Sequence, residues 1–478
     1  MSPLRLIARD ELRLMVRNRV ALIALGLILI LTIVAIATAW THQRGIADQR
    51  ARHQAAATAA FEAQPDRHPH RVVHYGHFIF RPLGPLAAFD PGVDAFTGSS
   101  MFLEGHRQNT ANFGDVRQSS LLVRFGQLTP AFVLQAVAPL LLIFLGYGVV
   151  ARETERGTLR PLMLQGATRA QIVGGKLLAL GGLALLVGLP AMIGLGLIAG
   201  QPGALATPIA TLALGYATYL ALWTVGIVAI SALVRRRRDA LLALLAVWTV
   251  TVVLLPRVAP DIANQAYPLA NRLQTDVGIA RDLRAMGDSH DPNDPHFAAF
   301  KQATLKRYGV SRVEDLPVNY KGVLALEGER LSTELFDRYT TESFAAQAKQ
   351  TALVDAIGLL SPTIALRSLS MAAAGTDLAG HRRFLDQAEA YRYALVQRLN
   401  ALEQDAVSYA DDTAVDAGAD RRKRVDAANW RALPAFTFHA PDGAKLARSA
   451  LPGLAVVVAW LVAATLVLTI ATRRMGAR

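Results

Sequence analysis

The chain has 478 residues, 52% of them hydrophobic, with a formal net charge of +13 and no cysteine. The apolar residues fall in long blocks, which indicates several membrane spans, and the lack of cysteine excludes a disulfide framework and thiolate chemistry. The positive charge gathers beside the apolar blocks rather than among aromatic residues, so it favours loops held in the cytoplasm over nucleic-acid binding. We therefore expect an all-α polytopic membrane protein with six transmembrane helices and a mostly helical extracytoplasmic domain.

The N-terminal residues 1–19 place leucines, isoleucine and methionine at helical spacing with arginines between them. This pattern predicts an amphipathic helix on the cytoplasmic surface of the membrane, in contact with lipid headgroups. Residues 20–40 form the first span, and the arginines before it place the N-terminus in the cytoplasm. Residues 41–127 are then a first external region, in which residues 43–62 are expected to continue as helix.

Four histidines lie close together in this first external region: His68, His70, His74 and His77. Neutral imidazole is a common ligand of zinc or copper, and His70 and His74 would share one face of a helix. Pro69 and the neighbouring valines argue against a helix and favour a strand over residues 71–80, and no carboxylate is locally paired with the histidines. We therefore predict packed or solvent-exposed histidines without a metal, with these four side chains as the candidates if one binds.

Four further apolar blocks predict spans over residues 128–150, 177–199, 208–234 and 239–255. Pro139 is expected to kink the first of these, and Pro256 to end the last. Four consecutive arginines, residues 235–238, place the loop between the last two in the cytoplasm. The spans are nearly free of ionisable residues, which proton- or sodium-driven carriers usually bury at mid-membrane. This favours a transporter that is driven from outside the membrane.

Residues 257–449 form a second and larger external region, which Ser361 and Pro362 interrupt between helices. Its periodicity predicts helices over residues 263–286, 295–308, 322–353 and 378–405. Residues 451–472 are the sixth span, and three arginines after it return the C-terminus to the cytoplasm. We expect a multi-pass protein of a bacterial inner membrane with both termini in the cytoplasm.

The loop over residues 151–176, between the second and third spans, is the most densely charged segment of the membrane half. A short apolar helix over residues 162–164 lies between two glycine turns, and Thr168 is placed to cap the helix that re-enters the membrane. Such a loop offers a surface to a soluble partner, although an ordinary solvated loop is the alternative. The candidate residues are Glu153, Glu155, Arg156, Gly157, Thr158, Arg160, Gly166, Arg169 and Lys176.

The order Glu-x-Glu-Arg-Gly-Thr-Leu, Leu-Met-Leu and Arg-x-x-Ile-x-x-Gly-Lys in this loop resembles the loop after the second span in permeases of the ABC-2 type exporter family. Segments of both external regions look like the outer loops of one branch of these permeases. In that family the loop holds the coupling helix, which docks on an ABC ATP-binding subunit. The resemblance implies a dimer with a second permease, identical or related, and places ATP and Mg in the partner subunit. The external regions could also dock a periplasmic partner.

No Gly-x-x-x-x-Gly-Lys-Ser/Thr phosphate loop, His-Glu-x-x-His pair or nucleophile elbow occurs in the sequence. We therefore expect no enzyme, no catalytic residue and no cofactor in this chain. The expected function is the membrane-spanning permease subunit of an ATP-driven ABC exporter. The alternative is a membrane-anchored mechanical-coupling or assembly protein, which a partner ATPase moves without transport across the membrane.

Overall fold

Helices dominate the computed structural model, which describes residues 2–111, 128–287 and 294–475. Six helices are long and apolar enough to cross a membrane: Ala21–Glu62, Pro130–Glu155, Arg169–Ala199, Ala206–Leu233, Arg237–Ala266 and Gly443–Arg474. The predicted six spans and the all-α polytopic class are thereby confirmed. The last part of the first predicted external region, residues 112–127, lies outside the described residues.

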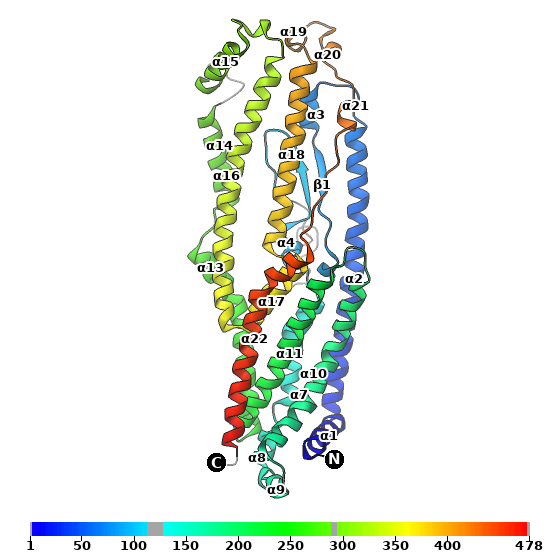
Figure 1. Ribbon diagram of the computed structural model, residues 1–478, viewed down its shortest axis with the longest axis vertical. Coiled ribbons are helices and arrows are strands. Elements are labelled where there is room, and N and C mark those ends of the chain that lie inside the picture. The colour runs from blue at the N-terminus through cyan, green and yellow to red at the C-terminus, as the bar shows by residue number, and fades with distance from the viewer. Residues whose placement is uncertain (1, 112–127, 288–293, 476–478) are drawn as a thin grey trace.

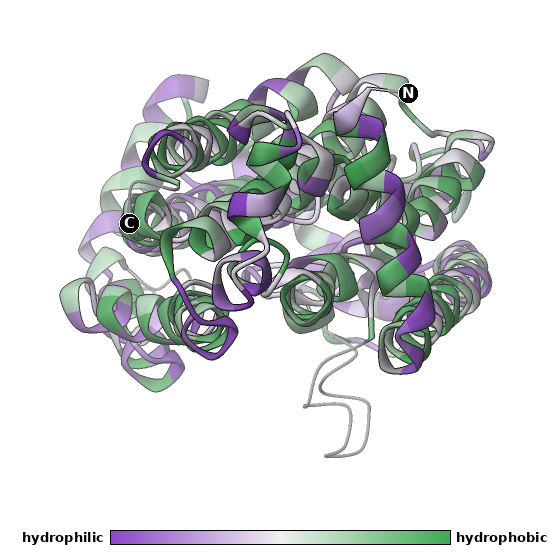
Figure 2. Ribbon diagram, turned by 90° about the horizontal axis from the view of Figure 1, so that it is seen from below, coloured by the Kyte–Doolittle hydropathy of each residue, from purple (hydrophilic) through white to green (hydrophobic). Residues whose placement is uncertain are grey.

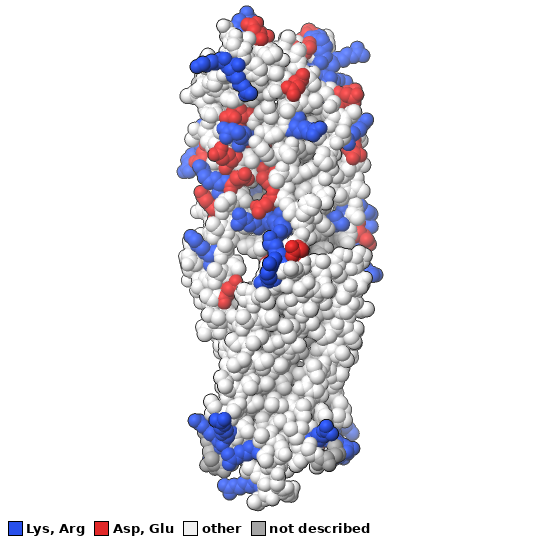
Figure 3. Space-filling model, viewed as in Figure 1, with Lys and Arg blue, Asp and Glu red and all other residues white. Residues whose placement is uncertain are grey.

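The molecule is an elongated rod, with the spans bundled at one end and a distal domain at the other (Figure 1). α1 (Pro3–Arg17) and the last turn of α22 (Gly443–Arg474) lie at the same end, here named the basic end. On the face shown in Figure 3, lysines and arginines cluster at this end, a nearly uncharged belt covers the spans, and charges of both signs cover the distal domain. An uncharged belt between two charged zones is the surface that a bilayer requires.

α2 (Arg19–Glu62) runs without interruption from the bundle into the distal domain (Figure 1). Its 44 residues extend over roughly 66 Å of α-helix, whereas a bilayer core is about 30 Å thick. The expectation that residues 43–62 continue the first span as helix is confirmed. The first span and the distal domain therefore share one helix.

Two spans contain a π-helical turn directly before a proline. η3 (Val133–Val137) precedes Pro139, at the predicted kink, and η4 (Thr249–Leu254) precedes Pro256. Pro256 does not end the helix, and the predicted end of the fifth span at residue 255 stays a prediction. The wider turn accommodates the proline ring and its missing N–H, so the chain stays helical through α13 (Leu255–Ala266).

α11 (Ala206–Leu233) lies at the centre of the bundle, where it packs against α10, α17 and α22. Seen end-on, the helices of the bundle carry long apolar stretches (Figure 2). Tyr216 and Tyr219 of α11 are fully buried. Gln135 Nε2 donates to the Tyr216 hydroxyl over 2.8 Å, and the Tyr219 hydroxyl donates to the carbonyl of Gln135 over 2.9 Å. These bonds satisfy buried polar groups where no water can reach them.

At Ser361 and Pro362 the sequence predicts only a break between helices. A further helix, α17 (Pro362–Ala374), begins there. Ser361 caps it, and ten of its 13 residues are buried between α11 and α22. Its Ser370 and Thr363 hydroxyls lie 2.9 and 2.8 Å from the hydroxyls of Tyr216 and Tyr219. The chain between the fifth and sixth spans therefore returns one helix to the end of the bundle that adjoins the distal domain (Figure 1).

Replacing Gly453 by alanine is expected to destabilise this junction by about 1–3 kcal/mol through overpacking. A Cβ at this position of α22 would lie 2.6 Å from the carbonyl oxygen of Ala365 in α17. Gly182→Ala on α10 is the matched control, because nothing lies within 4 Å of its added Cβ. Thermal unfolding in detergent measures both variants, and equal midpoints for the two would contradict the close packing of α17 on α22.

The predicted strand over residues 71–80 is only partly correct. α3 (Pro69–Tyr75) covers its first half, because Pro69 sits in the first turn, where its fixed φ suits a helix and no N–H is needed. β1 (His77–Phe80) forms the second half and pairs antiparallel with β2 (Ser100–Leu103). This hairpin packs on the distal half of α2 and on α18.

Three long helices form most of the distal domain: α14 (Arg272–Met286), α16 (Tyr320–Ile357) and α18 (Leu378–Ala406). The prediction of one helix over residues 263–286 is wrong, because the chain leaves the helix at Tyr267, before Pro268, and Asn271 caps a new one. The predicted helix over residues 295–308 has the same bounds as α15 (Pro295–Tyr308).

The remaining elements are short or complete the bundle: η1 (Pro85–Ala88), α4 (Asp94–Thr97), α6 (Pro130–Phe132), α7 (Ala138–Gly146), α8 (Ala151–Glu155), α9 (Leu159–Leu164), α10 (Arg169–Ala199), α12 (Arg237–Trp248), η5 (Val313–Asp315), η6 (Gly358–Leu360), α19 (Tyr409–Thr413), α20 (Ala419–Arg422) and α21 (Ala428–Arg431).

Candidate functional site

α8 and α9 form a hairpin that protrudes from the basic end of the bundle (Figure 1). Gly157 and Gly166, on either side of α9, have φ angles of 72° and 93°. Residues with a Cβ rarely adopt this left-handed conformation, so these glycines allow the turns that the sequence leads us to expect. The Thr168 hydroxyl caps α10 by accepting a hydrogen bond from the Gln171 N–H. The Gln171 side chain accepts from the Thr168 N–H, which completes a capping box.

α9 presents an apolar side chain to solvent. Leu164 is 87% exposed, whereas Leu159 at the other end of α9 is buried and anchors it. Arg156 and Arg160 are also exposed, and neither forms an ion pair within the described part of the chain. The hairpin thus carries an exposed leucine and two exposed guanidinium groups, which form a surface suited to contact with a protein.

The base of the hairpin is held by a buried network of four charged side chains: Glu11, Arg152, Glu153 and Lys176. Glu11 of α1 is 1% exposed and accepts from Arg152 Nη2 at 2.7 Å and from Lys176 Nζ. Lys176 Nζ also lies 2.9 Å from Glu153 Oε1. The network contains two negative and two positive charges, so the buried group is neutral as a whole.

Gly174 and Gly175 allow α1 to lie directly on α10. A Cβ on Gly175 would lie 2.8 Å from Ile7 and 2.9 Å from the carbonyl oxygen of Leu4. These two glycines therefore serve helix packing next to Lys176, as small residues do between membrane helices.

Other contacts fix the hairpin to three further helices. Glu155 accepts from the backbone and the side chain of Arg237 at the start of α12, at 2.9 and 3.2 Å. The Ser231 hydroxyl of α11 accepts from the N–H groups of Val150 and Ala151, at 3.1 and 3.0 Å. Arg169 donates to the carbonyl of Arg473 at the end of α22 over 2.7 Å. A displacement of the hairpin would therefore reach α1, α10, α11, α12 and α22.

The candidate loop residues divide into two groups. Arg156, Arg160 and the two glycine turns lie at the surface, together with Thr158, whose hydroxyl donates to Glu153. Glu153 and Lys176 turn inward instead, and Glu155 and Arg169 bind neighbouring helices. Sequence reasoning missed Leu164 and Glu11. An acidic residue among the arginines of a basic amphipathic helix was the available signal for Glu11.

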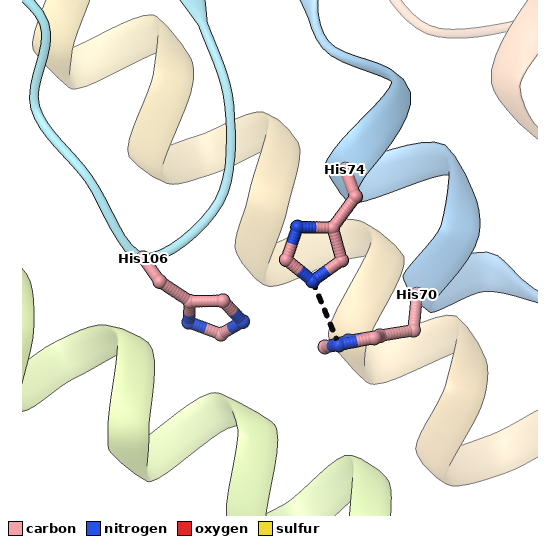
Figure 4. A group of neighbouring side chains, drawn as sticks. All are labelled: His70, His74 and His106. Carbon is pink, nitrogen blue, oxygen red and sulfur yellow. Dashed lines mark hydrogen bonds between the residues drawn. The ribbon is translucent and has the colours of Figure 1, made fainter.

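A second cluster of functional-type side chains lies in the distal domain. His70 and His74 of α3 and His106 of the turn after β2 point toward one another (Figure 4). One ring nitrogen from each lies within 4.8 Å of the other two, and His70 Nε2 lies 3.0 Å from His74 Nε2. Pro69 does not keep these histidines out of a helix, contrary to the prediction from sequence, because it lies in the first turn of α3 and His70 and His74 share a helical face. His106 was not among the sequence candidates.

The other two candidate histidines have structural roles. His68 Nδ1 accepts from the His70 N–H and caps α3, while its Nε2 lies 3.1 Å from Asp412 Oδ1. Burial lowers the pKa of His77 in β1 to about 4, and its ring packs on Phe61. Neither side chain is therefore part of the trio of His70, His74 and His106.

Three buried carboxylates surround the histidines, all from distant parts of the sequence. Glu329 Oε2 lies 3.3 Å from His106 Nδ1, and Glu403 Oε2 lies 3.8 Å from His70 Nδ1. The sequence predicts no carboxylate locally paired with these histidines. In the folded chain, however, Glu329 and Glu403 lie beside them. Burial raises the pKa of Glu403 to about 7, whereas hydrogen bonds from His68 and Asn319 outweigh burial and lower that of Asp412 to about 2.

Arg392 of α18 holds Glu329 in place. Arg392 is 1% exposed, and it donates to Glu329 at 2.5 Å, to Glu389 at 2.6 Å and to the carbonyl of Glu104 at 3.1 Å. Burial opposes ionisation of Glu329, but hydrogen bonds and charge from His106 and Arg392 lower its pKa to about 2. This network joins α16, α18 and the turn that carries His106.

These features define an all-α, multi-pass membrane protein with a large helical domain beyond one end of its spans. A family model described as a domain of unknown function, DUF3526, matches residues 272–439. The matched residues cover less than half of the chain and include α14 to α18, with Glu329 and Arg392. Among curated proteins, none matches this chain.

Proposed function

We propose that this chain is the membrane-spanning permease subunit of an ATP-driven ABC exporter, and that α8 and α9 dock on a separate ATP-binding subunit. The observation that carries the proposal is the exposed Leu164 on a hairpin that is locked into the bundle. In this proposal Leu164 lies in the contact with the partner, beside the exposed charges of Arg156 and Arg160 on the same hairpin. The residue order of the hairpin also resembles that of the coupling loop in ABC-2 type permeases.

The charge pattern supports a bacterial inner membrane with the basic end in the cytoplasm. Arg17, Arg237, Arg238, Arg473 and Arg474 all lie at or beside helix ends at this end of the spans. Basic residues accumulate on the cytoplasmic side of membrane helices. Both termini would then share a compartment with the ATP-binding subunit.

The proposed mechanism is a two-state change biased by nucleotide. Closure of the ATP-binding subunits on ATP and Mg would push the hairpin, and the chain itself would hydrolyse nothing. Because Glu11, Ser231 and Arg237 bind the hairpin from three helices, the push would reach the bundle as a rigid-body motion. A second permease, identical or related, would complete the path for the substrate.

The continuous helix α2 favours a second candidate function, mechanical coupling without transport. Its 44 residues connect the membrane bundle with the hairpin of β1 and β2 in the distal domain. α16 is 38 residues long, or roughly 57 Å of helix, and adds a second stiff element. Motion at the basic end would move the distal domain, which could act on a periplasmic partner.

Replacing Leu164 by aspartate is expected to abolish co-purification of an ATP-hydrolysing subunit with the detergent-solubilised chain. An aspartate would put a charge into the centre of an apolar contact, where truncation of one anchor residue costs about 2 kcal/mol or more, a loss of roughly thirtyfold in affinity. The measurement is ATPase activity and subunit content after affinity purification from the native host.

Val415→Asp is the matched control, since Val415 is 99% exposed in the distal domain. It is expected to retain the ATP-hydrolysing subunit in full. The docking proposal is contradicted if the wild type brings down no such subunit, or if Leu164→Asp retains as much of it as the control does.

A further inference from the structure

The three histidines of the distal domain have the spacing of a metal site. The ring centroids of His70, His74 and His106 lie 4.6, 5.5 and 5.4 Å apart in the three pairs. Two imidazole nitrogens bound to one tetrahedral zinc ion, each about 2.0–2.1 Å from it, lie roughly 3.4 Å apart. The 3.0 Å between His70 Nε2 and His74 Nε2 differs from this by a few tenths of an ångström, which a side-chain rotation supplies.

A buried carboxylate orients the ring of His106 for metal binding. Glu329 Oε2 lies 3.3 Å from Nδ1 of His106, whereas Glu403 Oε2 lies 3.8 Å from Nδ1 of His70, beyond hydrogen-bond distance. A carboxylate that accepts from Nδ1–H leaves Nε2 without a proton and raises its basicity as a ligand. In His106, Nε2 is then the nitrogen that an ion would bind.

The backbone of His106 is held in an unusual conformation. Its φ of 61° is the sole positive value among the non-glycine residues that the structure describes. The His106 N–H donates to Glu329 over 2.8 Å, and Arg392 donates to the carbonyl of Glu104, two residues earlier in the chain. Strained residues persist only where the surroundings determine them, and they cluster at ligand sites. Buried groups thus position a histidine that is itself partly exposed.

We propose that His70, His74 and His106 bind one divalent transition-metal ion of the zinc type through their Nε2 atoms. Three imidazoles leave one tetrahedral position for water or a fourth ligand, and the partly exposed rings leave the ion open to solvent. In α3 the ion would take the place of the proton shared between His70 and His74. It would link α3 to the turn after β2.

His68 is not a ligand in this proposal, although only Pro69 separates it from His70 in the sequence. Its Nδ1 caps α3 and its Nε2 binds Asp412, so both ring nitrogens are in use. The ligand set therefore combines two of the four histidines that the sequence singles out with one from the next loop.

The test is metal binding by the full chain in detergent, stripped with a chelator and then titrated with Zn²⁺ and Co²⁺. The wild type is expected to bind one more ion per chain than His74→Ala or His106→Asn, and its Co²⁺ form to show the intense visible absorption of a four-coordinate site. His53→Ala, an exposed histidine of α2, should match the wild type.

Asparagine tolerates a left-handed backbone, so His106→Asn decides the question even if His74→Ala does not fold. Thermal unfolding without metal reports the folding of each variant. Equal stoichiometry and affinity in the wild type, the folded variants and His53→Ala would mean adventitious binding only and would overturn the site. The measurement needs no ATP-binding subunit, so its outcome is independent of the proposed coupling function.

Discussion

Replacing Lys176 by methionine is expected to destabilise the protein by about 3–5 kcal/mol, as removal of one partner from a buried ion pair does. The side chain is 3% exposed and binds Glu11, which is 1% exposed, and Glu153. Without the ammonium, the network keeps two carboxylates and a single guanidinium, that of Arg152. The uncompensated negative charge cannot move into water unless α1 separates from α10, because the two helices pack against each other there.

The double variant Glu11→Gln with Lys176→Met is expected to recover most of this loss, because Arg152 and Glu153 then remain as a neutral pair 3.6 Å apart. Arg160→Met is the control, since an exposed side chain changes stability by about 0.5 kcal/mol or less. The unfolding free energies in detergent form a double-mutant cycle. If the single and double variants lose equal stability, the loss comes from packing and the charge argument fails.

If Lys176→Met folds, it also separates two roles for this residue. A residue that contacts the ATP-binding subunit directly would weaken co-purification without lowering stability. The buried position of Lys176 leads us to expect the reverse order: stability falls first, and association falls because α8 loses its support at Glu153.

Features set by local sequence were predictable. The spans follow from long apolar blocks. Thr168 marks the start of one helix by capping it, and Pro295 marks the start of another by its fixed φ; both signals depend only on residues nearby in the sequence. The sequence did not predict helix directly after Pro256 or Pro69, for one reason. A proline excludes a regular helix interior, but a π turn or a first-turn position accommodates it.

Features set by tertiary contact were not predictable. α17 is 13 residues long, too short to read as a span and too apolar to read as a surface helix, and its burial depends on α11 and α22. The site at the histidines needs His106 and Glu329, more than 200 residues apart in the chain. In the hairpin, the sequence shows which side chains are charged, but only the packing of α1 shows that Lys176 faces inward.

Replacing Arg392 by methionine is expected to destabilise the distal domain by about 3–5 kcal/mol, since Glu329 is fully buried and would lose its main counter-charge. Arg330→Met on α16, the helix that carries Glu329, is the matched control. Arg330 is 48% exposed and pairs with Glu327 and Glu334 at the surface, so its loss should cost about 1 kcal/mol or less. Unfolding is measured with chelator present, so that no metal contributes at His106.

The pH dependence of this variant tests the electrostatic origin of the effect. In the wild type the pKa of Glu329 is lowered to about 2, so its contribution is complete above the unfolded value and is lost between about pH 5 and pH 2. Without Arg392 the burial remains, and the folded pKa should rise above the unfolded value. The variant then gains stability by binding a proton as the pH falls. Its deficit against the wild type should therefore shrink from about pH 8 to about pH 5.

Glu389 faces the same network in both proteins, and burial raises its pKa, so the comparison rests on the difference between variant and wild type. A deficit that stays constant over this range would mean that the lost packing of the arginine side chain, and not the charge on Glu329, causes the destabilisation. The double variant Arg392→Met with Glu329→Gln distinguishes the two accounts again. It should show a smaller deficit than the single variant and no pH dependence from this position, because a glutamine in the buried site has no proton to gain.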